Sequence, residues 1–288
     1  MTKRVVSTLI LWLGLLGILF FFGTQGAVWI IAAAAAMTQY EIYRMFERMG
    51  LKPDKSLGIL CGLLITLGGY YFGFVVEGLP NTEAGTDLYV LGVIFLSMAT
   101  ISNSQSSERL RNFIPTLIGL TFIPFMLHFF VRILLKCELE GFNRGTGLFL
   151  CLYILATSKF TDVGALLVGK FFGKHKMAPQ LSPAKTWEGA IGGVIVAALV
   201  GMLVIQIDIW TGSRFHPERM TLLLAALMAI PISIVTIASD LMESAFKRAA
   251  QVKDSGNLVP GIGGAFDLTD SLILAAPCGY ILFKLAIL

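Results

Sequence analysis

Long apolar segments follow one another along the whole chain, and this feature most constrains how the chain can fold. A helix needs about 20 apolar residues to cross the hydrocarbon core of a bilayer. We identify nine segments that approach this length, the fourth being the shortest: 5–22, 27–46, 57–76, 86–101, 113–135, 146–169, 187–206, 220–238 and 269–287. Because they lack the period-two alternation of a transmembrane barrel, the sequence predicts helices.

The composition supports an integral membrane protein. Of 288 residues, 56% are hydrophobic and only 14% are charged, and the mean hydropathy is +0.79. A soluble domain would carry roughly a quarter of charged residues. We therefore expect an all-α, polytopic bundle of about nine transmembrane helices. The net charge of +4 is small for a nucleic-acid-binding protein, so we expect no nucleic-acid partner.

The placement of Lys and Arg predicts the orientation, because cytoplasmic loops carry an excess of both. With a cytoplasmic N-terminus, the inside segments hold most of the basic residues, whereas the outside loop around Glu77, Glu83 and Asp87 holds none. We expect Lys3 and Arg4 to precede a retained anchor rather than a cleaved signal peptide. The loops 170–186 and 239–268 then face the cytoplasm, and the cell inner membrane is the expected location.

Polar residues of a specific kind appear only in the second half of the chain. We therefore expect residues 1–145 to form an N-terminal scaffold or lipid-access region. Residues 146–288 are expected to form the catalytic region, with the active site at its cytoplasmic face.

The segment 239–270 places acids, a basic pair and a glycine-rich turn between two apolar spans. Charged groups at a membrane boundary are costly, so such a cluster is by default a functional-site hypothesis. Carboxylates that leave room for water and phosphate oxygens suit Mg²⁺. We predict Asp240 and Asp267 as metal ligands. The alternatives are an ion pair of Asp240 with Lys247 or Lys185, and a helix cap at Asp267 with Asp270 in the first turn.

Basic residues and glycines in the same segment suit phosphate binding. Lys247, Arg248 and Lys253 can clamp phosphates, although an interfacial basic run also matches anionic lipid head groups. Gly263 and Gly264 let the backbone approach a ligand closely.

A second motif, Ser182-Pro183-Ala184-Lys185-Thr186-Trp187-Glu188-Gly189, has a typical helix start. The sequence predicts Ser182 as N-cap and Pro183 as the first helical residue. Lys185 would then lie in the first turn, where a bound anion offsets its unfavourable interaction with the helix dipole. A snorkelling lysine is the alternative. Gly189 and Gly193 form a G-x-x-x-G face, which indicates helix packing.

A third motif lies near the end of the sixth span. Lys159 and Asp162 are three residues apart, so they can form a structural pair on one helix face. Alternatively, Asp162 faces a polar cavity and orients a cation or a substrate group.

Together these motifs resemble the phosphatidate cytidylyltransferases, also called CDP-diacylglycerol synthases. The run S-A-F-K-R, then K-D-S-G-N-L-V-P-G-I-G-G-A-F-D-L-T-D, between Ser244 and Asp270 resembles the family signature. The blocks D-V-G-A at 162–165 and S-P-A-K-T-W-E-G at 182–189 look like other family blocks, in the right order. Ile262 and Leu268 stand where the family usually has His and Arg.

The resemblance implies a reaction of CTP with phosphatidate that gives CDP-diacylglycerol and pyrophosphate, with Mg²⁺ as cofactor and the bilayer as surroundings. It also implies a homodimer. The residues that would contact the reacting groups are Asp162, Lys185, Asp240, Lys247, Arg248 and Asp267. Those that would shape the substrate and phosphate pocket are Ser182, Thr186, Ser244, Lys253, Asp254, Gly263 and Gly264.

Other functions stay open at the level of sequence. One is a CTP-dependent transferase that acts on another lipid phosphate or on a prenol, and another is an inactive homologue. An ion-coupled transporter would use Lys159, Asp162 and Asp240 as a relay. Transporters often carry broken helices in both halves. Here the interrupted polar segments lie in one half, which favours an enzyme.

Overall fold

The structure, a computed structural model, describes residues 2–75, 83–103, 106–143, 145–256 and 263–288. The chain divides into two compact units, residues 1–135 with 246–269, and residues 136–245 with 270–288. The division falls inside three helices, α6 (Met126–Leu139), α9 (Leu222–Ala249) and α10 (Ala265–Ala286), each of which contributes to both units.

Helices make up most of the described part of unit 1, with short non-helical segments between them. It comprises α1 (Thr2–Arg48), α2 (Lys55–Leu63), a π-helical turn η1 (Leu64–Gly68), α3 (Gly69–Val75), α4 (Ala84–Asn103), α5 (Ser106–Leu120), a second π-helical turn η2 (Thr121–Phe125), the first part of α6, the end of α9 and the start of α10. Tyr43 joins three of these segments, because its hydroxyl donates to Thr116 O at 2.8 Å and accepts from Gln39 Nε2, which also donates to Gly58 O.

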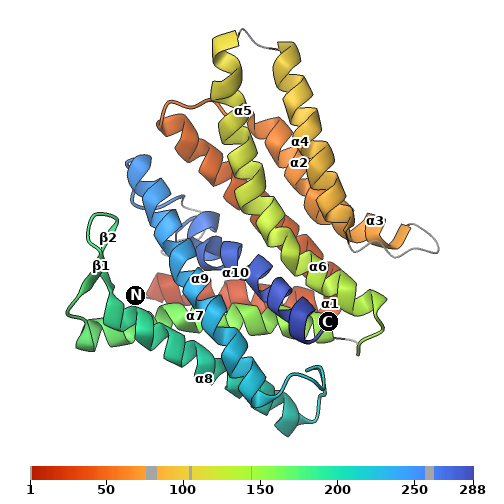
Figure 1. Ribbon diagram of the computed structural model, residues 1–288, viewed down its shortest axis with the longest axis vertical. Helices are drawn as coiled ribbons and strands as arrows, with labels where there is room; N and C mark the ends of the chain where they lie inside the picture. The colour runs from red at the N-terminus through yellow and green to blue at the C-terminus, as the bar shows by residue number, and fades with distance from the viewer. Residues whose placement is uncertain (1, 76–82, 104–105, 144, 257–262) are drawn as a thin grey trace. The chain divides into compact units, whose positions relative to one another are not determined.

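Unit 2 is built from long helices and a short hairpin. It comprises the end of α6, α7 (Thr146–Phe172), β1 (Lys176–Ala178), β2 (Ser182–Thr186), α8 (Trp187–Thr211), most of α9 and most of α10. The two antiparallel strands pair Lys176 with Thr186 and Ala178 with Ser182. Figure 1 shows this hairpin at one end of α7 and α8.

Glycines let α7 and α8 approach each other closely. A Cβ added to Gly189 would lie 2.7 Å from Ala165 O, and one added to Gly193 would lie 2.8 Å from Thr161 O. At Gly192 the added atom would overlap the side chain of Val168. The predicted packing role of the G-x-x-x-G face is therefore confirmed.

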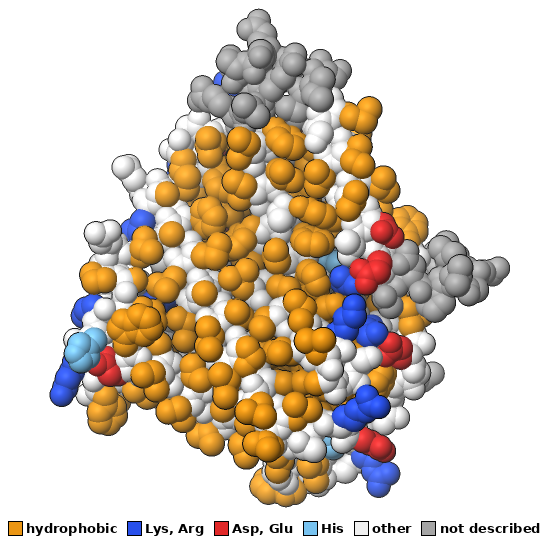
Figure 2. Space-filling view, viewed as in Figure 1, with side chains coloured by type: hydrophobic (Ala, Val, Ile, Leu, Met, Phe, Trp, Pro, Cys, Tyr) orange, Lys and Arg blue, Asp and Glu red, His pale blue; other side chains and the backbone are white. Residues whose placement is uncertain are grey.

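Seven helices in the described ranges are long and apolar enough to cross a membrane: Leu13–Arg48, Lys55–Gly73, Asn112–Leu139, Thr146–Phe172, Trp187–Thr211, Leu222–Ala249 and Ala265–Ala286. Many of their large apolar side chains are exposed, such as Leu166, Leu199 and Leu223, and hydrophobic side chains cover most of the face in Figure 2. Side chains so exposed need a lipid environment, which makes this an integral membrane protein.

Eight of the nine predicted segments lie in these seven helices, and the ninth lies in a shorter helix. The predicted spans 5–22 and 27–46 both lie within α1, which consists of two helices joined at a kink at Gly23 (φ 54°, ψ −132°), between the two predicted spans. The predicted span 86–101 corresponds to α4, of which the apolar part Ala84–Ala99 is shorter than a full span. The remaining six predicted spans each coincide with one helix. The hairpin is a small exception to the all-α prediction.

Candidate functional site

The hairpin and the start of α8 correct one sequence prediction. Ser182 is not an N-cap, and Pro183 does not open a helix: both lie in strand β2. The helix begins at Trp187, and Thr186 is its N-cap, with Oγ1 accepting from Gly189 N at 3.2 Å. The fixed φ of proline suits an extended backbone as well as a first helical turn, so pairing with β1 decides the conformation. Lys185 therefore precedes the helix.

Glu188 anchors the hairpin to α8. Its carboxylate accepts from the backbone N–H groups of Lys174 and His175 at 3.1 and 3.2 Å, and it lies 2.6 Å from His175 Nδ1. In addition, Trp187 N donates to His175 O at 3.0 Å. These contacts fix the chain that enters β1 and so fix the position of the strand pair.

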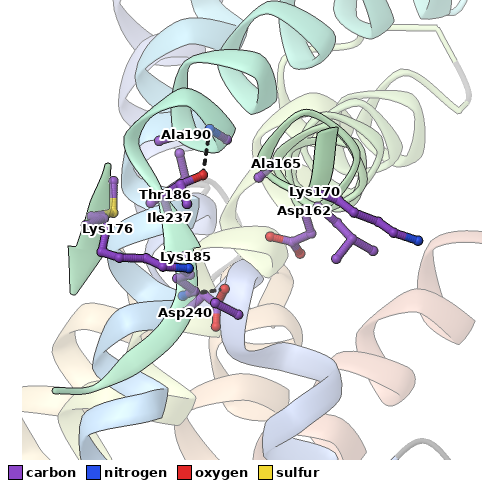
Figure 3. Close-up of a pocket in the computed structure, with 14 residues that line it drawn as sticks. Asp162, Ala165, Lys170, Lys176, Lys185, Thr186, Ala190, Ile237 and Asp240 are labelled. Atoms are coloured by element: carbon purple, nitrogen blue, oxygen red, sulfur yellow. Dashed lines mark hydrogen bonds and ion pairs between the residues drawn. The ribbon is translucent and has the colours of Figure 1, made fainter. Parts of the chain in front are cut away.

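A cavity of about 480 Å³ lies between the hairpin and helices α7, α8 and α9, all within unit 2. Figure 3 shows its polar side chains, with Asp162 on α7 and Lys185 on β2. The apolar part of the lining is formed by Ala165, Leu166, Met177, Ala184, Ala190 and Ile237. The ionisable residues are Asp162, Lys170, Lys176, Lys185 and Asp240, and Gly169, Thr186 and Gly189 complete the lining. An apolar cavity with a few converging charges is the usual form of a ligand site.

An ion pair crosses one wall of this cavity. Lys185 Nζ lies 2.6 Å from Asp240 Oδ2, and both side chains are partly exposed to the cavity. The structure therefore shows one of the two ion pairs that the sequence left open for Asp240. The Nζ atom is enclosed in the pair, so an anionic group of a ligand would reach it by displacing the Asp240 carboxylate.

Asp240 also belongs to a cluster of three carboxylates. Ligand oxygens of Asp240, Glu243 and Asp270 lie within 4.8 Å of one another, and Glu243 is buried. Three carboxylates this close repel one another unless a cation balances them. An oxygen-only donor set is what a hard divalent cation such as Mg²⁺ prefers. These residues fit such an ion.

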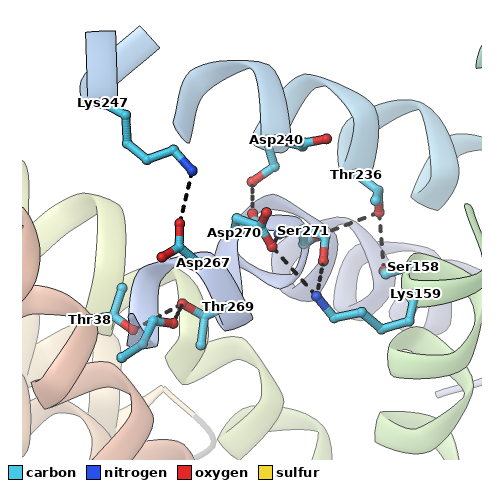
Figure 4. A network of polar contacts seen from close by, with 12 residues as sticks. Thr38, Ser158, Lys159, Thr236, Asp240, Lys247, Asp267, Thr269, Asp270 and Ser271 are labelled. Carbon is cyan, nitrogen blue, oxygen red and sulfur yellow. Dashed lines mark hydrogen bonds and ion pairs between the residues drawn. The ribbon is translucent and has the colours of Figure 1, made fainter. Parts of the chain in front are cut away.

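Lys159 supports this cluster rather than pairing with Asp162. Its Nζ donates to Ser271 Oγ at 2.7 Å and lies 3.5 Å from an oxygen of Asp270 (Figure 4). Ser271 N also donates to Asp270 Oδ1 at 2.6 Å. Asp162 lies on the cavity wall instead. The geometry thus favours the interpretation that Asp162 faces a cavity, although this cavity is mainly apolar with a few converging charges.

In unit 1, Asp267 lies at the centre of a separate network. Its Oδ1 accepts from Lys247 Nζ at 2.8 Å (Figure 4), and its Oδ2 accepts from Gly264 N at 2.7 Å. Ser255 donates to the same Oδ2 through both its backbone N–H and its hydroxyl. Asp267 is the third residue of α10 and so is not its N-cap; its carboxylate instead accepts from the backbone N–H of Gly264, the residue before the helix. Its role as a metal ligand stays a prediction.

The other predicted site residues lie on α9 and α10 and in the turn between them. Ser244 is half-buried on α9, and Arg248 is exposed in the last turn of that helix. Lys253 and Asp254 are exposed after α9. Gly263 has φ +131°, which an L side chain rarely adopts. Of the two departures from the family pattern, Leu268 is half-buried on α10, and Ile262 lies outside the described residues.

The comparisons with known proteins agree with these motifs. The profile of the Cytidylyltransferase family matches residues 2–286. The chain belongs to this family. It is 30% identical to the phosphatidate cytidylyltransferase of Haemophilus influenzae over 281 residues, which are 96% of each chain. It is also 30% identical to the phosphatidate cytidylyltransferase of Synechocystis sp. over 279 residues, which are 88% of this chain and 87% of the relative. With the phosphatidate cytidylyltransferase of Bacillus subtilis the identity is 30% over 259 residues, which are 89% of this chain and 88% of the relative. The match therefore includes the N-terminal helices, beyond residues 155–275 where the motifs lie.

Some residues at the site of this cytidylyltransferase were not predicted from the sequence as functional. Neither Glu243 nor Asp270 was predicted as a metal ligand, and Asp270 was expected only in the first turn of a helix. The separation of Asp240 and Glu243 by three residues on one helix face was the available sign. Lys170 and Lys176 line the cavity, and only the hairpin places them there.

Proposed function

We propose that this protein is a CTP:phosphatidate cytidylyltransferase, a nucleotidyltransferase that makes CDP-diacylglycerol and pyrophosphate for phospholipid synthesis. The structural observation that most supports this proposal is the cavity in which Lys185 forms an ion pair with Asp240, a member of the three-carboxylate cluster. The names of the relatives and the family resemblance support CTP and phosphatidate as substrates.

In the proposed reaction, an oxygen of the lipid phosphate attacks the α-phosphorus of CTP. The bond from that phosphorus to the oxygen bridging to the β-phosphate breaks, and pyrophosphate leaves. The transfer needs little covalent chemistry from the protein, so positioning and charge neutralisation supply most of the catalysis. Lys185 would neutralise phosphate charge in the cavity, with Lys170 and Lys176 beside it. Apolar residues such as Leu166 and Ile237 suit the start of the acyl chains.

Asp240, Glu243 and Asp270 would hold a divalent cation, which we propose to be Mg²⁺. Such an ion supplies positive charge that neutralises phosphate oxygens as charge develops on the leaving group. Asp267 remains a proposed ligand from the sequence, with Lys247 and Arg248 as proposed phosphate contacts. Asp162 would orient groups inside the cavity.

The distribution of Lys and Arg supports a topology of nine spans with a cytoplasmic N-terminus in the inner membrane. The active site would then open to the cytoplasm, where CTP is available. We assign lipid access to residues 1–145 and the chemistry to residues 146–288. The family resemblance alone supports a homodimer.

The test is incubation of purified protein with CTP, Mg²⁺ and phosphatidate, scored for CDP-lipid and pyrophosphate. Isoprenoid and other lipid phosphates are offered in parallel. We expect product with phosphatidate and its loss after removal of divalent ions. Product from another lipid alone would replace the substrate assignment. Absence of product from any lipid, together with solute uptake into proteoliposomes, would support a transporter instead.

A further inference from the structure

A carboxylate from the N-terminal helix holds the start of α10. Glu41 lies on α1 and is buried, with 8% of its surface exposed. Its Oε1 accepts from Ala265 N at 2.9 Å, and its Oε2 accepts from Phe266 N at 2.9 Å. Oε2 also accepts from Ser255 Oγ at 2.7 Å. All four residues belong to unit 1. Each carboxylate oxygen of Glu41 therefore has its own backbone donor.

The first turn of any helix has backbone N–H groups without partners inside the helix. Such groups are usually capped by a residue next to the helix in sequence. At the start of α10, Gly264 N donates a hydrogen bond to the nearby Asp267. Ala265 N and Phe266 N instead donate to Glu41, which lies 224 and 225 residues away in the sequence. The helix start is thus tied to α1.

Ser255 couples the two carboxylates. Its hydroxyl lies 2.7 Å from Glu41 Oε2 and 2.9 Å from Asp267 Oδ2. A hydroxyl has a single proton, so it can donate to only one of them at a time. Ser255 N also donates to Asp267, and this keeps the residue in place whichever way the hydroxyl turns. A displacement of Glu41 would therefore shift Asp267 as well, because both contact Ser255 and because Glu41 holds the start of the helix that carries Asp267.

Two glycines of the same segment are required by the position of Glu41. A Cβ added at Gly256 or at Gly264 would overlap the Glu41 carboxylate. Gly264 was interpreted from the sequence as a place where the backbone approaches a ligand. In the structure, a side chain there would displace the Ser255 hydroxyl and the Glu41 carboxylate, both of which belong to the protein itself.

We propose that Glu41 is a positioning residue of the transferase reaction. It fixes Ser255 and the first turn of α10, and it thereby sets the orientation of Asp267 and of Lys247, which is bonded to Asp267. This inference rests on the proposed function. It gives α1 a part in catalysis in addition to scaffolding.

The test compares Glu41→Gln with Thr38→Val. A glutamine amide has one accepting oxygen, and its NH₂ group would face an N–H or O–H donor, so the substitution breaks part of the network at nearly constant volume. Thr38 lies one turn earlier on the same face of α1, and its Oγ1 is 2.9 Å from Thr269 Oγ1. Thr38→Val loses that contact, while Thr269 keeps its bond to Ala265 O.

We expect Glu41→Gln to lower kcat by about 10- to 100-fold, the usual effect of losing a residue that orients a reacting group. The KM for phosphatidate should change less than about twofold, because its proposed cavity is lined by other residues. Hydrogen exchange at the amides of Ala265 and Phe266 should accelerate. Thr38→Val should leave kcat and these amides nearly unchanged. Ser255→Ala, which removes only the bridging hydroxyl, should give an intermediate loss of kcat even if Glu41→Gln folds poorly.

Equal kcat values for Glu41→Gln and Thr38→Val would overturn the inference, as would faster exchange in Glu41→Gln with normal turnover. Full activity of Ser255→Ala would remove the coupling to Asp267 and with it the inference. A wild-type protein that makes no CDP-lipid would instead overturn the proposed function. The exchange comparison would then still test whether Glu41 holds the start of α10.

Discussion

Lys185 on β2 and Asp240 on α9 form an ion pair of 2.6 Å across the wall of the cavity in unit 2. Neither side chain is fully buried, although the Lys185 Nζ atom itself is enclosed. An anion that binds to Lys185 would compete with Asp240, whose carboxylate would then be balanced by a cation. The pair therefore places an anion site and a cation site next to each other.

Asp240→Asn should lower the rate of CDP-lipid formation by about 100-fold or more, because it removes one of three clustered carboxylates and the partner of Lys185. Asparagine has nearly the same shape, so the thermal unfolding temperature in detergent should change little. Turnover of the purified variant is the measurement. Glu218→Gln, an exposed carboxylate of the same unit, is the control and should be active. Near-normal turnover of Asp240→Asn would refute the role of Asp240.

Glu243→Gln should raise the Mg²⁺ concentration needed for half-maximal activity by about tenfold or more, because Glu243 belongs to the proposed cation site. A Mg²⁺ titration at saturating CTP measures this shift. Asp267→Asn in the same titration tests the ligand predicted from the sequence. If Asp267→Asn shifts the titration and Glu243→Gln does not, the cation site has been assigned to the wrong carboxylates.

Gly192→Ala should destabilise unit 2 by about 1–3 kcal/mol, because the added methyl group would overlap Val168 where α7 and α8 meet. The free energy of unfolding in mixed micelles is the measurement. The matched control is Gly17→Ala on α1, where no described atom lies within 4 Å of the added carbon. That variant should be unchanged or slightly more stable, since alanine favours a helix. Equal stabilities of the two variants would contradict the close approach of α7 and α8.

Glu188→Ala should loosen the hairpin, because its carboxylate holds the backbone of Lys174 and His175. We expect faster hydrogen exchange at these two amides and about a tenfold lower kcat/KM, since Lys185 would lose its fixed position. His175→Gln removes only the side-chain contact of Glu188, so its effect should be smaller. Unchanged exchange in Glu188→Ala would show that strand pairing alone holds the hairpin.

The sequence was sufficient for the helices but not for the hairpin. Apolar length and the absence of a period of two predicted the spans, because a bilayer imposes both. Ser182 and Pro183 are typical of the start of a helix, but they form a strand here because this segment pairs with residues 176–178. Local propensity is a weak guide wherever a tertiary contact supplies the hydrogen bonds.

The site was predicted in its chemistry more than in its geometry. Asp240 was identified because charged groups at a membrane boundary are costly. Lys185 was identified from an expected helix start, which the structure replaces with strand β2. Glu41 was missed, because it lies inside an apolar helix and its partners are more than 200 residues away. A single sequence gives no indication of a contact at that separation.

The close contact of α7 and α8 also limits how the cavity can adapt. Where Gly169 and Gly189 line it, main chain lies against main chain, and the Cα of Gly189 is 3.5 Å from the ideal Cβ position of Gly169. No rotamer change can widen such a wall. Ligands with head groups of different size must be accommodated by other parts of the lining, such as the side chains of Ile237 and of Met177 in the hairpin. Substitution of Ile237 or Met177 is therefore the direct way to alter the selectivity of the cavity for ligand head groups.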